Sequence, residues 1–438
     1  MSSSDPTPGG APAPAEPLPG ASGPGASGPG RLGAVFVLLT VVLDAAGMGL
    51  IMPVMPELLR EFSVGGELSG AAVIGGWLAF SYAFAQFLCA PVIGALSDAH
   101  GRRPVLLISM AAMSLDYVLL ATTGALWVLI LARLLSGAAG ATMTPARAWL
   151  ADQSRPEDRG KAFGRIGAAF GLGFVLGPAL GGLLGEYGPR APIWAAAAIA
   201  GVNFVFGWFV LSESLPPALR RPFEWAAVDP TRALRRAAKL PNIGLLMLAY
   251  LLYDFALYAY PSVWTFVASA SWNWGATEIG VSLAGYGLFA GLSMAFLIGP
   301  ATRALGTTRL VVIALAVEAA LAVCVATFSA GWAVFALLPL LGATAIAGPA
   351  LEGMISASAP ADRQGEISGV IAALTSVAAI LSPPMMTAVF AAATSGPGPH
   401  MPGAPFLLSA LIALLGLGAF LVGLRRARRK GPPGAAAA

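Results

Sequence analysis

The chain contains 438 residues, of which 57% are hydrophobic and only 11% are charged, and its formal net charge is +4. Soluble domains carry roughly a quarter charged residues, so this composition excludes an ordinary water-soluble protein. The two cysteines, Cys89 and Cys324, both lie in apolar stretches. That setting favours packing as small hydrophobic side chains over a disulfide or a metal site.

The N-terminal segment, residues 1–30, consists almost entirely of Pro, Gly, Ala and Ser, with Asp5 and Glu16 as its only side-chain charges. A segment of this composition cannot bury a core, so we predict a disordered tail. It also lacks the basic region followed by an apolar run that marks a cleavable signal peptide. We therefore expect the first apolar span to direct membrane insertion.

Twelve apolar stretches follow this tail. A hydrocarbon core of about 30 Å requires about 20 apolar residues per helix. The stretches that meet this length run over residues 33–54, 71–96, 104–122, 126–150, 161–184, 192–211, 241–269, 276–301, 307–327, 331–357, 365–391 and 404–424. Twelve in succession argue against buried helices of a soluble core. We predict an all-α integral membrane protein with twelve transmembrane helices.

A polar stretch in the middle of the chain divides these helices into two sets of six. We predict a six-helix bundle over residues 31–211, a cytoplasmic linker over 212–240 and a second six-helix bundle over 241–424. A basic cytoplasmic tail, 425–438, completes the chain.

Lysine and arginine gather on one side of the predicted helices. The loops and tail on that side carry Arg102, Arg103, Arg155, Arg159, Lys161, Arg220, Arg221, Arg232, Arg235, Arg236, Lys239, Arg303, Arg309, Arg363, Arg425, Arg426, Arg428, Arg429 and Lys430. The opposite loops carry only Arg60 and Arg190. Because basic loops stay in the cytoplasm, we predict that both termini are cytoplasmic and that the chain lies in the inner (plasma) membrane. The basic tail then indicates topology rather than binding to nucleic acid.

Three motifs occur in both halves in the same order. The repeated pairs are Gly94 to Gly101 with Gly299 to Gly306, Pro156 to Arg159 with Pro360 to Arg363, and Pro178 with Pro383. Three ordered matches indicate a duplication. Two pseudo-symmetric six-helix halves in the same orientation are the arrangement of major facilitator transporters.

The ten residues from Gly94 to Arg103 are the most specific local motif. They predict a tight turn that needs Gly94 and Gly101, because a Cβ atom would crowd the chain there. Asp98 can pair with a nearby cation or a helix N-terminus, which would give an interhelical latch that changes as the halves move. The alternative is that Arg102 and Arg103 only set the topology. We assign a gating role to this motif.

The fifth span carries Gly173, Gly177 and Pro178, followed by Gly181 and Gly182. Small residues at this spacing give a smooth face for close helix packing, and proline frees a backbone carbonyl and bends the helix. Because many membrane helices have such faces, packing alone is the alternative to the gating role that we assign to Gly177 and Pro178.

Five charged residues lie deep inside predicted spans: Asp44, Asp116, Arg133, Asp254 and Glu318. A charge inside a membrane is costly unless it is paired, hydrated or neutralised, so a functional role is the first hypothesis for each. A carboxyl group removed from water takes up a proton more readily, which suits the four acids to proton coupling. Arg133 would hold a partner acid ionised, and substrate arrival could change that pairing. The alternative for each acid is an inert interhelical hydrogen bond.

Substrate contacts are harder to predict. Tyr82, Gln86, Tyr253 and Tyr258 are our candidates for the wall of a cavity, although aromatic residues also serve as interface belts and packing. Glu352 lies nearer the cytoplasmic end of its span. Its position fits a contact with the substrate, but it equally fits snorkelling of the side chain to the membrane surface or an ion pair between the halves.

Nothing in the sequence argues for an enzyme. It contains no phosphate-binding glycine loop with Lys-Ser/Thr, so we expect no ATP and no other cofactor, and a proton gradient as the driving force. His100 and His400 are loop residues and form no metal cluster, so we expect no metal site.

Several segments resemble the tetracycline efflux antiporters, a group of twelve-helix drug:proton antiporters in the major facilitator superfamily. The matching segments are Val42 to Pro56, Gln86 to Asp98, Arg102 to Leu107, Asp116-Tyr117, Gly348 to Leu351 and Leu374 to Ser376, together with the glycine-proline pattern of the fifth span. The resemblance runs from about residue 33 to residue 390 and is strongest in the first half. It implies a drug:proton antiporter that exports from the cytoplasm.

The resemblance also implies site residues. Asp44 and Asp116 match membrane acids of that family, Arg102 and Arg103 its loop motif, and Arg133 its fourth-helix arginine. Glu318 stands where the family has an aspartate important for proton coupling. Four positions depart from the family: Ala290 and Met294 replace a histidine and a glutamine used in coupling and drug binding, Glu352 replaces a common glutamine, and Asp254 an uncharged residue. Ala290, Met294 and Glu352 are further candidates for substrate contact, and the changes leave open a related or more cationic substrate than tetracycline.

We therefore expect a transporter that exports a small amphipathic compound in exchange for protons, by alternating access, as a monomer in the lipid bilayer. One alternative is the import of a small metabolite by symport, which the fifth-span pattern disfavours. Another is a transport-dead sensor on the same scaffold, which would not need to keep the membrane acids.

Overall fold

The computed structural model describes residues 29–140, 143–223, 244–358, 363–396 and 398–429. Most of the N-terminal tail and of the predicted linker lie outside these ranges, as do part of the second Pro-Arg motif and the end of the basic tail. The described ranges contain no strand, and twelve helical segments within them are long and apolar enough to cross a membrane. The predicted all-α membrane protein with twelve spans is confirmed.

The first six spans are built from the elements α1 (Pro29–Ile51), η1 (Met52–Val54) and α2 (Met55–Arg60), then η2 (Val64–Gly66), α3 (Leu68–His100), α4 (Arg102–Thr122), α5 (Leu126–Ala139), α6 (Met143–Asp152), η3 (Pro156–Asp158), α7 (Arg159–Gly185), α8 (Ala191–Val210) and η4 (Pro217–Leu219). The first span extends six residues beyond the predicted end at residue 54, because η1 and α2 continue its helical course to Arg60.

The last six spans are built from α10 (Gly244–Leu257), α11 (Ala259–Trp272), α12 (Ala276–Leu292), the π-helical η6 (Ser293–Leu297), α13 (Ile298–Leu305), α14 (Thr307–Thr327), α15 (Gly331–Thr344), α16 (Ala347–Ala357), α17 (Gln364–Ser395) and α18 (Ala404–Arg429). A helix forms all of its backbone hydrogen bonds within one segment, whereas a sheet in lipid must close into a barrel to do so. This explains why each apolar stretch adopts a helix.

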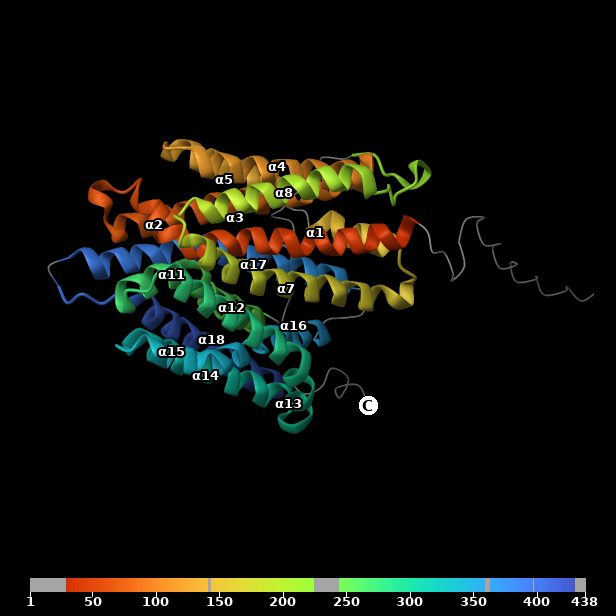
Figure 1. Ribbon diagram of the computed structural model, residues 1–438. Helices are drawn as coiled ribbons and strands as arrows, with labels where there is room; N and C mark the ends of the chain where they lie inside the picture. Colours follow the sequence, from red (N-terminus) through yellow and green to blue (C-terminus); the bar gives the residue numbers. More distant parts are fainter. Residues whose placement is uncertain (1–28, 141–142, 224–243, 359–362, 397, 430–438) are drawn as a thin grey trace, which may run out of the picture.

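The helices associate as two bundles (Figure 1). In the first, α1 packs on α7 and α8, and α3 and α4 pack on α5; in the second, α18 packs on α10 and α14, and α12 on α15. The most extensive helix pairs that join the bundles are α3 with α17 and α7 with α12, and α11 also packs on α3. The described chain begins and finishes at the same end of the molecule, which we call the terminal end, and the opposite end is the far end. The domain boundaries proposed from the sequence stay a prediction.

Glycine forms the turn after the second span and again after the eighth. Gly101 separates α3 from α4 with φ 106°, and Gly306 separates α13 from α14 with φ 74°. Such angles strain any residue with a Cβ atom, so the repeated glycines have the same conformational cause. The predicted turn is thus present at Gly101, but the prediction is wrong for Gly94. That residue lies inside α3, where an added Cβ would be 3.8 Å from Thr144 Cγ2, an ordinary contact.

Small residues allow α1 and α7 to approach backbone to backbone. A Cβ atom added to Gly173 would lie 2.2 Å from the Val42 carbonyl oxygen, and one added to Gly177 would lie 2.5 Å from that of Ala46. The glycine face predicted for the fifth span is therefore used for close helix packing. Pro178 is buried in the same face, against Gly49 of α1.

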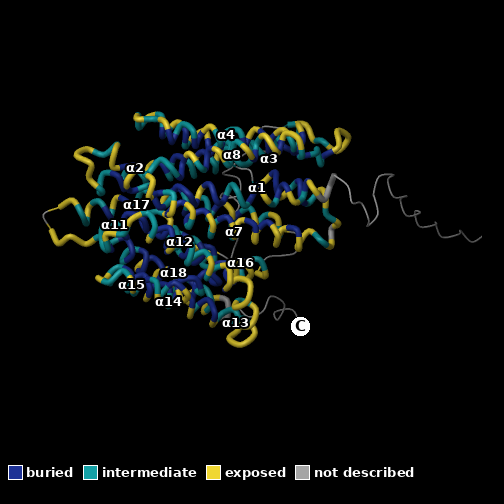
Figure 2. The backbone as a smooth tube through the Cα atoms, in the orientation of Figure 1, coloured by how far each residue is buried: buried dark blue, intermediate teal, exposed yellow. Residues whose placement is uncertain are grey.

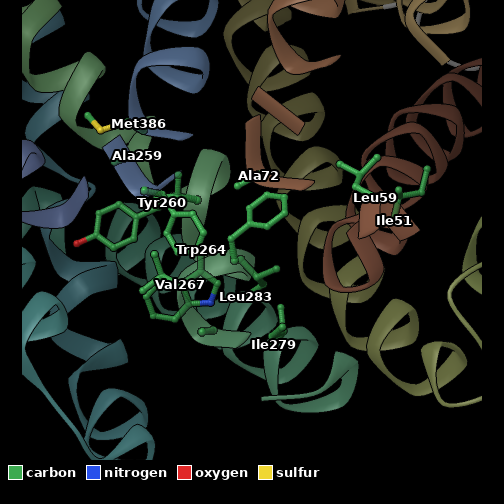
Figure 3. Packing of buried hydrophobic residues seen from close by; sticks show 14 of the residues in the cluster. Ile51, Leu59, Ala72, Ala259, Tyr260, Trp264, Val267, Ile279, Leu283 and Met386 are labelled. Carbon is green, nitrogen blue, oxygen red and sulfur yellow. The ribbon is translucent and has the colours of Figure 1, made fainter. Parts of the chain in front are cut away.

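The hydrophobic core is shared at the far end and divided at the terminal end. One cluster of buried side chains combines both bundles and includes Leu59 and Ala72 of the first with Tyr260 and Trp264 of the second (Figure 3). Toward the terminal end, each bundle has its own cluster of buried side chains. The cluster of the first bundle includes Trp149, and that of the second includes Tyr250 and Leu351. Exposed residues lie in the loops and also along the outer faces of the helices (Figure 2), where large apolar side chains such as Leu131, Leu172 and Val202 are exposed. The two bundles are therefore held together by apolar packing mainly at the far end.

Candidate functional site

A cavity of about 570 Å³ lies between the two bundles. Its walls come from α1, α3, α4, α5, α6, α7, α11 and α17, and from residues that join these helices. Five residues predicted from the sequence line it: Asp44, Tyr82, Gln86, Arg133 and Tyr258. The remaining lining is mostly apolar and includes Met48, Met52, Met55, Met113, Met143, Phe170 and Phe266. A mainly apolar wall with a few polar groups fits a small amphipathic ligand.

The bundles meet closely at the far end. The Thr277 hydroxyl of α12 donates to the Gly182 carbonyl oxygen of α7 at 3.2 Å and to Glu186 Oε1 at 2.8 Å. A Cβ atom added to Gly75 of α3 would lie 3.0 Å from Cζ of Phe266 in α11. These contacts close the far end of the cavity.

The terminal end lacks comparable contacts among the described residues. Gly160, Gly164, Gly167 and Gly171 of α7 have no atom within 4 Å of an added Cβ, although Gly182 of the same helix is closely packed. The five ion pairs of the described ranges all lie within the first bundle, so none of them joins the bundles. The described contacts between the bundles therefore concentrate at the far end.

A buried ion pair lies behind the wall of the cavity in the first bundle. The Arg133 guanidinium of α5 contacts Asp116 Oδ2 of α4, and Asp116 is only 1% exposed. The other carboxylate oxygen, Oδ1, has no hydrogen-bond partner among the described residues. Arg133 lines the cavity and Asp116 does not. The arginine therefore stands between the cavity and the buried acid, where a ligand could change the pairing.

Tyr82 connects this pair to Asp44. Its hydroxyl accepts a bond from the Gln86 side-chain amide at 3.4 Å, and the same amide donates to the Gly140 carbonyl oxygen at 3.3 Å. Tyr82 interacts electrostatically with Arg133, Asp44 and Asp116. The predicted residues of the first bundle are therefore brought together around one wall of the cavity.

The loop motif forms a charge network at the terminal end of the first bundle. Arg102 contacts Asp98, and its Nε lies 3.3 Å from Asp152 Oδ2 of α6. The Arg103 guanidinium donates to the Trp208 carbonyl oxygen at 2.7 Å and lies over the Trp208 ring. Asp98 thus joins helices of one bundle, and no described contact joins it to the other bundle.

Glu213 completes this network and was missed from the sequence. Its carboxylate accepts the backbone N–H groups of Arg102 at 2.8 Å and of Arg103 at 3.3 Å, so it caps the first turn of α4. An anion at a helix N-terminus is stabilised by the free N–H groups and by the helix dipole. The available signal was an acid directly after the sixth apolar span, between Ser212 and Ser214.

Glu318 is enclosed in the second bundle and does not line the cavity. It is 2% exposed, and it accepts a hydrogen bond from the Thr344 hydroxyl. Its Oε1 has no hydrogen-bond partner among the described residues. The rings of Tyr260 and Tyr286 stack beside it with centroids 6.1 Å apart, and both interact with it electrostatically. A carboxylate in this aromatic setting has little compensation for its charge.

Asp254 and Glu352 also lie outside the cavity lining. Asp254 of α10 is buried, and Glu352 of α16 is exposed and accepts a hydrogen bond from the Tyr250 hydroxyl at 2.9 Å. Within the described ranges neither acid takes part in an ion pair.

Three further candidates for substrate contact are not brought to the cavity. Tyr253 is buried against Gly348 of α16. Ala290 packs where α12 meets Gly342 of α15, and Met294 is exposed in the π-helical turn η6. The structure therefore gives these residues no contact with a ligand in the central cavity. No group of three or more His, Cys, Asp or Glu side chains that could hold a metal ion occurs among the described residues.

Comparison with known proteins agrees with this architecture. The family model of the Major Facilitator Superfamily matches residues 37–267 and 246–438. The chain is 40% identical to the class C tetracycline resistance protein of Escherichia coli, over 82% of this chain and 90% of that protein. It is 35% identical to the class G tetracycline resistance protein of Vibrio anguillarum, over 83% of this chain and 91% of that protein.

Among solved structures, the chain resembles a bacterial homolog of the human lysosomal transporter Spinster in an inward-facing and unoccupied conformation. The TM-score is 0.74 at 14% identity, and the match covers 94% of this chain and all of the other. This likeness supports the fold alone. The family model and the sequence relatives show that the chain belongs to the Major Facilitator Superfamily of membrane transporters, in which it is related to the tetracycline resistance proteins.

Proposed function

We propose that the protein exports a small amphipathic, drug-like compound from the cytoplasm in exchange for protons, as a monomer, and that tetracycline is the first candidate substrate. The relatives named for tetracycline resistance support the substrate class. The observation that carries the proposal is the central cavity, which has an apolar wall, room for a drug-sized molecule and carboxyl groups within and behind its lining.

The direction of transport rests on the basic residues. Lysine and arginine of the loops are concentrated at the terminal end, which we therefore assign to the cytoplasm. The far end would then face outward, and the separated terminal ends of the bundles would correspond to a state that takes up substrate from inside.

Protons would drive the return to this state. Asp44, Asp116, Asp254 and Glu318 are the proposed proton-coupling groups, since each is a carboxyl group within an apolar span. Protonation from outside would release the substrate, and deprotonation inside would restore the acids. Arg133 would exchange its partner as the substrate binds beside it.

The repeated turns and the glycine-rich helix would allow the bundles to rock. Gly101, Asp98 and the two arginines of the loop motif hold α3, α4 and α6 together as one body, which favours rigid-body motion of the first bundle. Gly177 and Pro178 fix α7 on α1, so that both helices would move together.

Drug accumulation in cells that lack their own pumps tests the proposal. We expect cells that express the protein to accumulate less tetracycline, and accumulation to rise when the proton gradient is collapsed. Export of another compound from a panel of cationic and neutral drugs would keep the mechanism and replace the substrate. If nothing in the panel moves, import or sensing explains the scaffold better, and the proposal fails.

A further inference from the structure

Four side chains of the second bundle form a continuous polar group near the terminal end. The Tyr250 hydroxyl of α10 donates to Glu352 Oε1 of α16 at 2.9 Å and lies 3.0 Å from Thr375 Oγ1 of α17. Thr375 also lies against the carboxylate of Asp254, which interacts electrostatically with Glu352. Two acids from two helices are therefore linked through two hydroxyl groups.

Among the described residues, no lysine or arginine forms an ion pair with this group. Between residues 244 and 424 the only Lys or Arg residues are Arg303, Arg309 and Arg363, and all three lie at the terminal ends of their helices. Asp254 is 7% exposed, and its Oδ2 has no hydrogen-bond partner among the described residues. Burying a carboxylate without a positive charge beside it costs free energy. A bound cation would therefore stabilise this site.

The group lies behind the wall of the central cavity, one helical turn from a residue that lines it. Tyr258, which follows Asp254 by one helical turn, lines the cavity and interacts electrostatically both with Asp254 and with Tyr82 of the other bundle. Glu352, at the other side of the group, is exposed. The charge of Asp254 therefore acts on the wall of the cavity through Tyr258, which would attract a positively charged group of a ligand toward this side of the cavity.

We propose that Asp254 and Glu352, supported by Tyr250 and Thr375, bind the positively charged group of an organic cation, such as a protonated or quaternary amine. This inference rests on the proposed export function and narrows its substrate class. An organic cation suits the site better than a metal ion, because the described residues contain no group of three acids, histidines or cysteines for a metal.

Equilibrium binding to the purified full-length protein tests the site with a matched pair of probes. The tetraphenylphosphonium cation carries one permanent charge, and triphenylphosphine oxide is a neutral relative. Binding of both is measured for the wild type, Asp254→Asn, Glu352→Gln and the control Glu366→Gln. Glu366 is an acid in the first turn of α17, at the same end of the same bundle but outside the polar group.

We expect the wild type and Glu366→Gln to bind the cation more tightly than the neutral probe. Asp254→Asn and Glu352→Gln should each weaken binding of the cation by about tenfold or more, as expected when one charged contact is lost, and leave the neutral probe unaffected. If Asp254→Asn does not fold, the exposed Glu352→Gln decides the question alone.

Two results would overturn the site. One is equal binding of the cation by the wild type and both variants, and the other is a wild type that does not bind the cation at all. Either result leaves the export proposal standing if the accumulation assay with tetracycline is positive. A negative accumulation assay, by contrast, rejects the export proposal whatever the binding data show.

Discussion

The two bundles share one fold but treat charge inside the membrane in different ways. In the first bundle, buried Asp116 is paired with Arg133. In the second bundle, the described side-chain hydrogen-bond partners of Asp254, Glu318 and Glu352 are hydroxyl groups, from Tyr250, Tyr260, Thr344 and Thr375. An internal ion pair is already compensated, whereas uncompensated acids are suited to an external cation or a proton. The two bundles therefore differ in how a few buried side chains are compensated.

The largest effect is expected from Arg133→Gln. It leaves Asp116 buried without its counter-charge, and breaking such a pair costs about 3–5 kcal/mol. The free energy of unfolding should fall accordingly, and export should be lost. Thermal unfolding of the purified protein and the accumulation assay measure the two effects.

The double variant Asp116→Asn/Arg133→Gln is the matched control, because it removes both charges. It should recover most of the lost stability without recovering export. An Arg133→Gln variant as stable as the wild type would show that the first bundle does not depend on the ion pair.

The two glycine turns give a second comparison. Gly101→Ala and Gly306→Ala both force a side chain into a glycine conformation, which costs about 1–3 kcal/mol. Only at Gly101 would the new Cβ also meet a side chain, 2.2 Å from Glu213 Oε2, while nothing lies within 4 Å at Gly306. Gly101→Ala should therefore lower stability and export more than Gly306→Ala.

Gly94→Ala is the control for this pair, because Gly94 is helical and has room for a Cβ. It should be neutral or stabilise the protein by up to about 1 kcal/mol. Equal losses of stability and export in Gly101→Ala and Gly306→Ala would show that the contact with Glu213 does not add to the cost at Gly101.

Glu318→Gln should have a smaller effect on stability than Arg133→Gln. No ion pair is broken, and a neutral amide is less costly than a carboxylate in this setting, so we expect a change within about 1 kcal/mol of zero. Export driven by a proton gradient should nevertheless fall, because the amide cannot carry a proton. Full proton-driven export by this variant would remove Glu318 from the coupling scheme.

Asp98→Asn should have the smallest effect on stability. The Asp98 side chain is 45% exposed, and its bond to Arg102 is of the surface type, worth about 0–1 kcal/mol. If the loop motif gates transport, export should still fall while the amount of protein in the membrane stays constant. Unchanged export would mean that Arg102 and Arg103 serve topology alone.

The fold could be predicted from the sequence because its causes are local. Each span needs only enough apolar residues to satisfy its backbone in lipid, and twelve stretches met that condition. The repeated glycines could be located for the same reason, since Gly101 and Gly306 each follow a helix that must turn. Gly94 could not be judged in this way, because a helical glycine and a turn glycine look alike in a sequence.

The site was only partly predictable, because it depends on contacts between distant segments. Asp44, Tyr82 and Arg133 could be named from their residue types, and they line the cavity. Glu213 and Thr375 could not, because their importance comes from partners more than 100 residues away in the chain. Ala290 and Met294 were predicted to contact the substrate because they stand at positions that the resembling family uses for this purpose. The position of a residue in a sequence does not determine the direction in which its side chain points.

Proton release on drug binding tests the central claim most directly. The purified protein is mixed with the exported drug in weakly buffered solution, and the pH is recorded for the wild type and for a variant with Asp44, Asp116, Asp254 and Glu318 changed to amides. We predict that the wild type releases protons as the drug binds and that the variant releases none. Drug binding by the wild type without any proton release would contradict exchange at these acids.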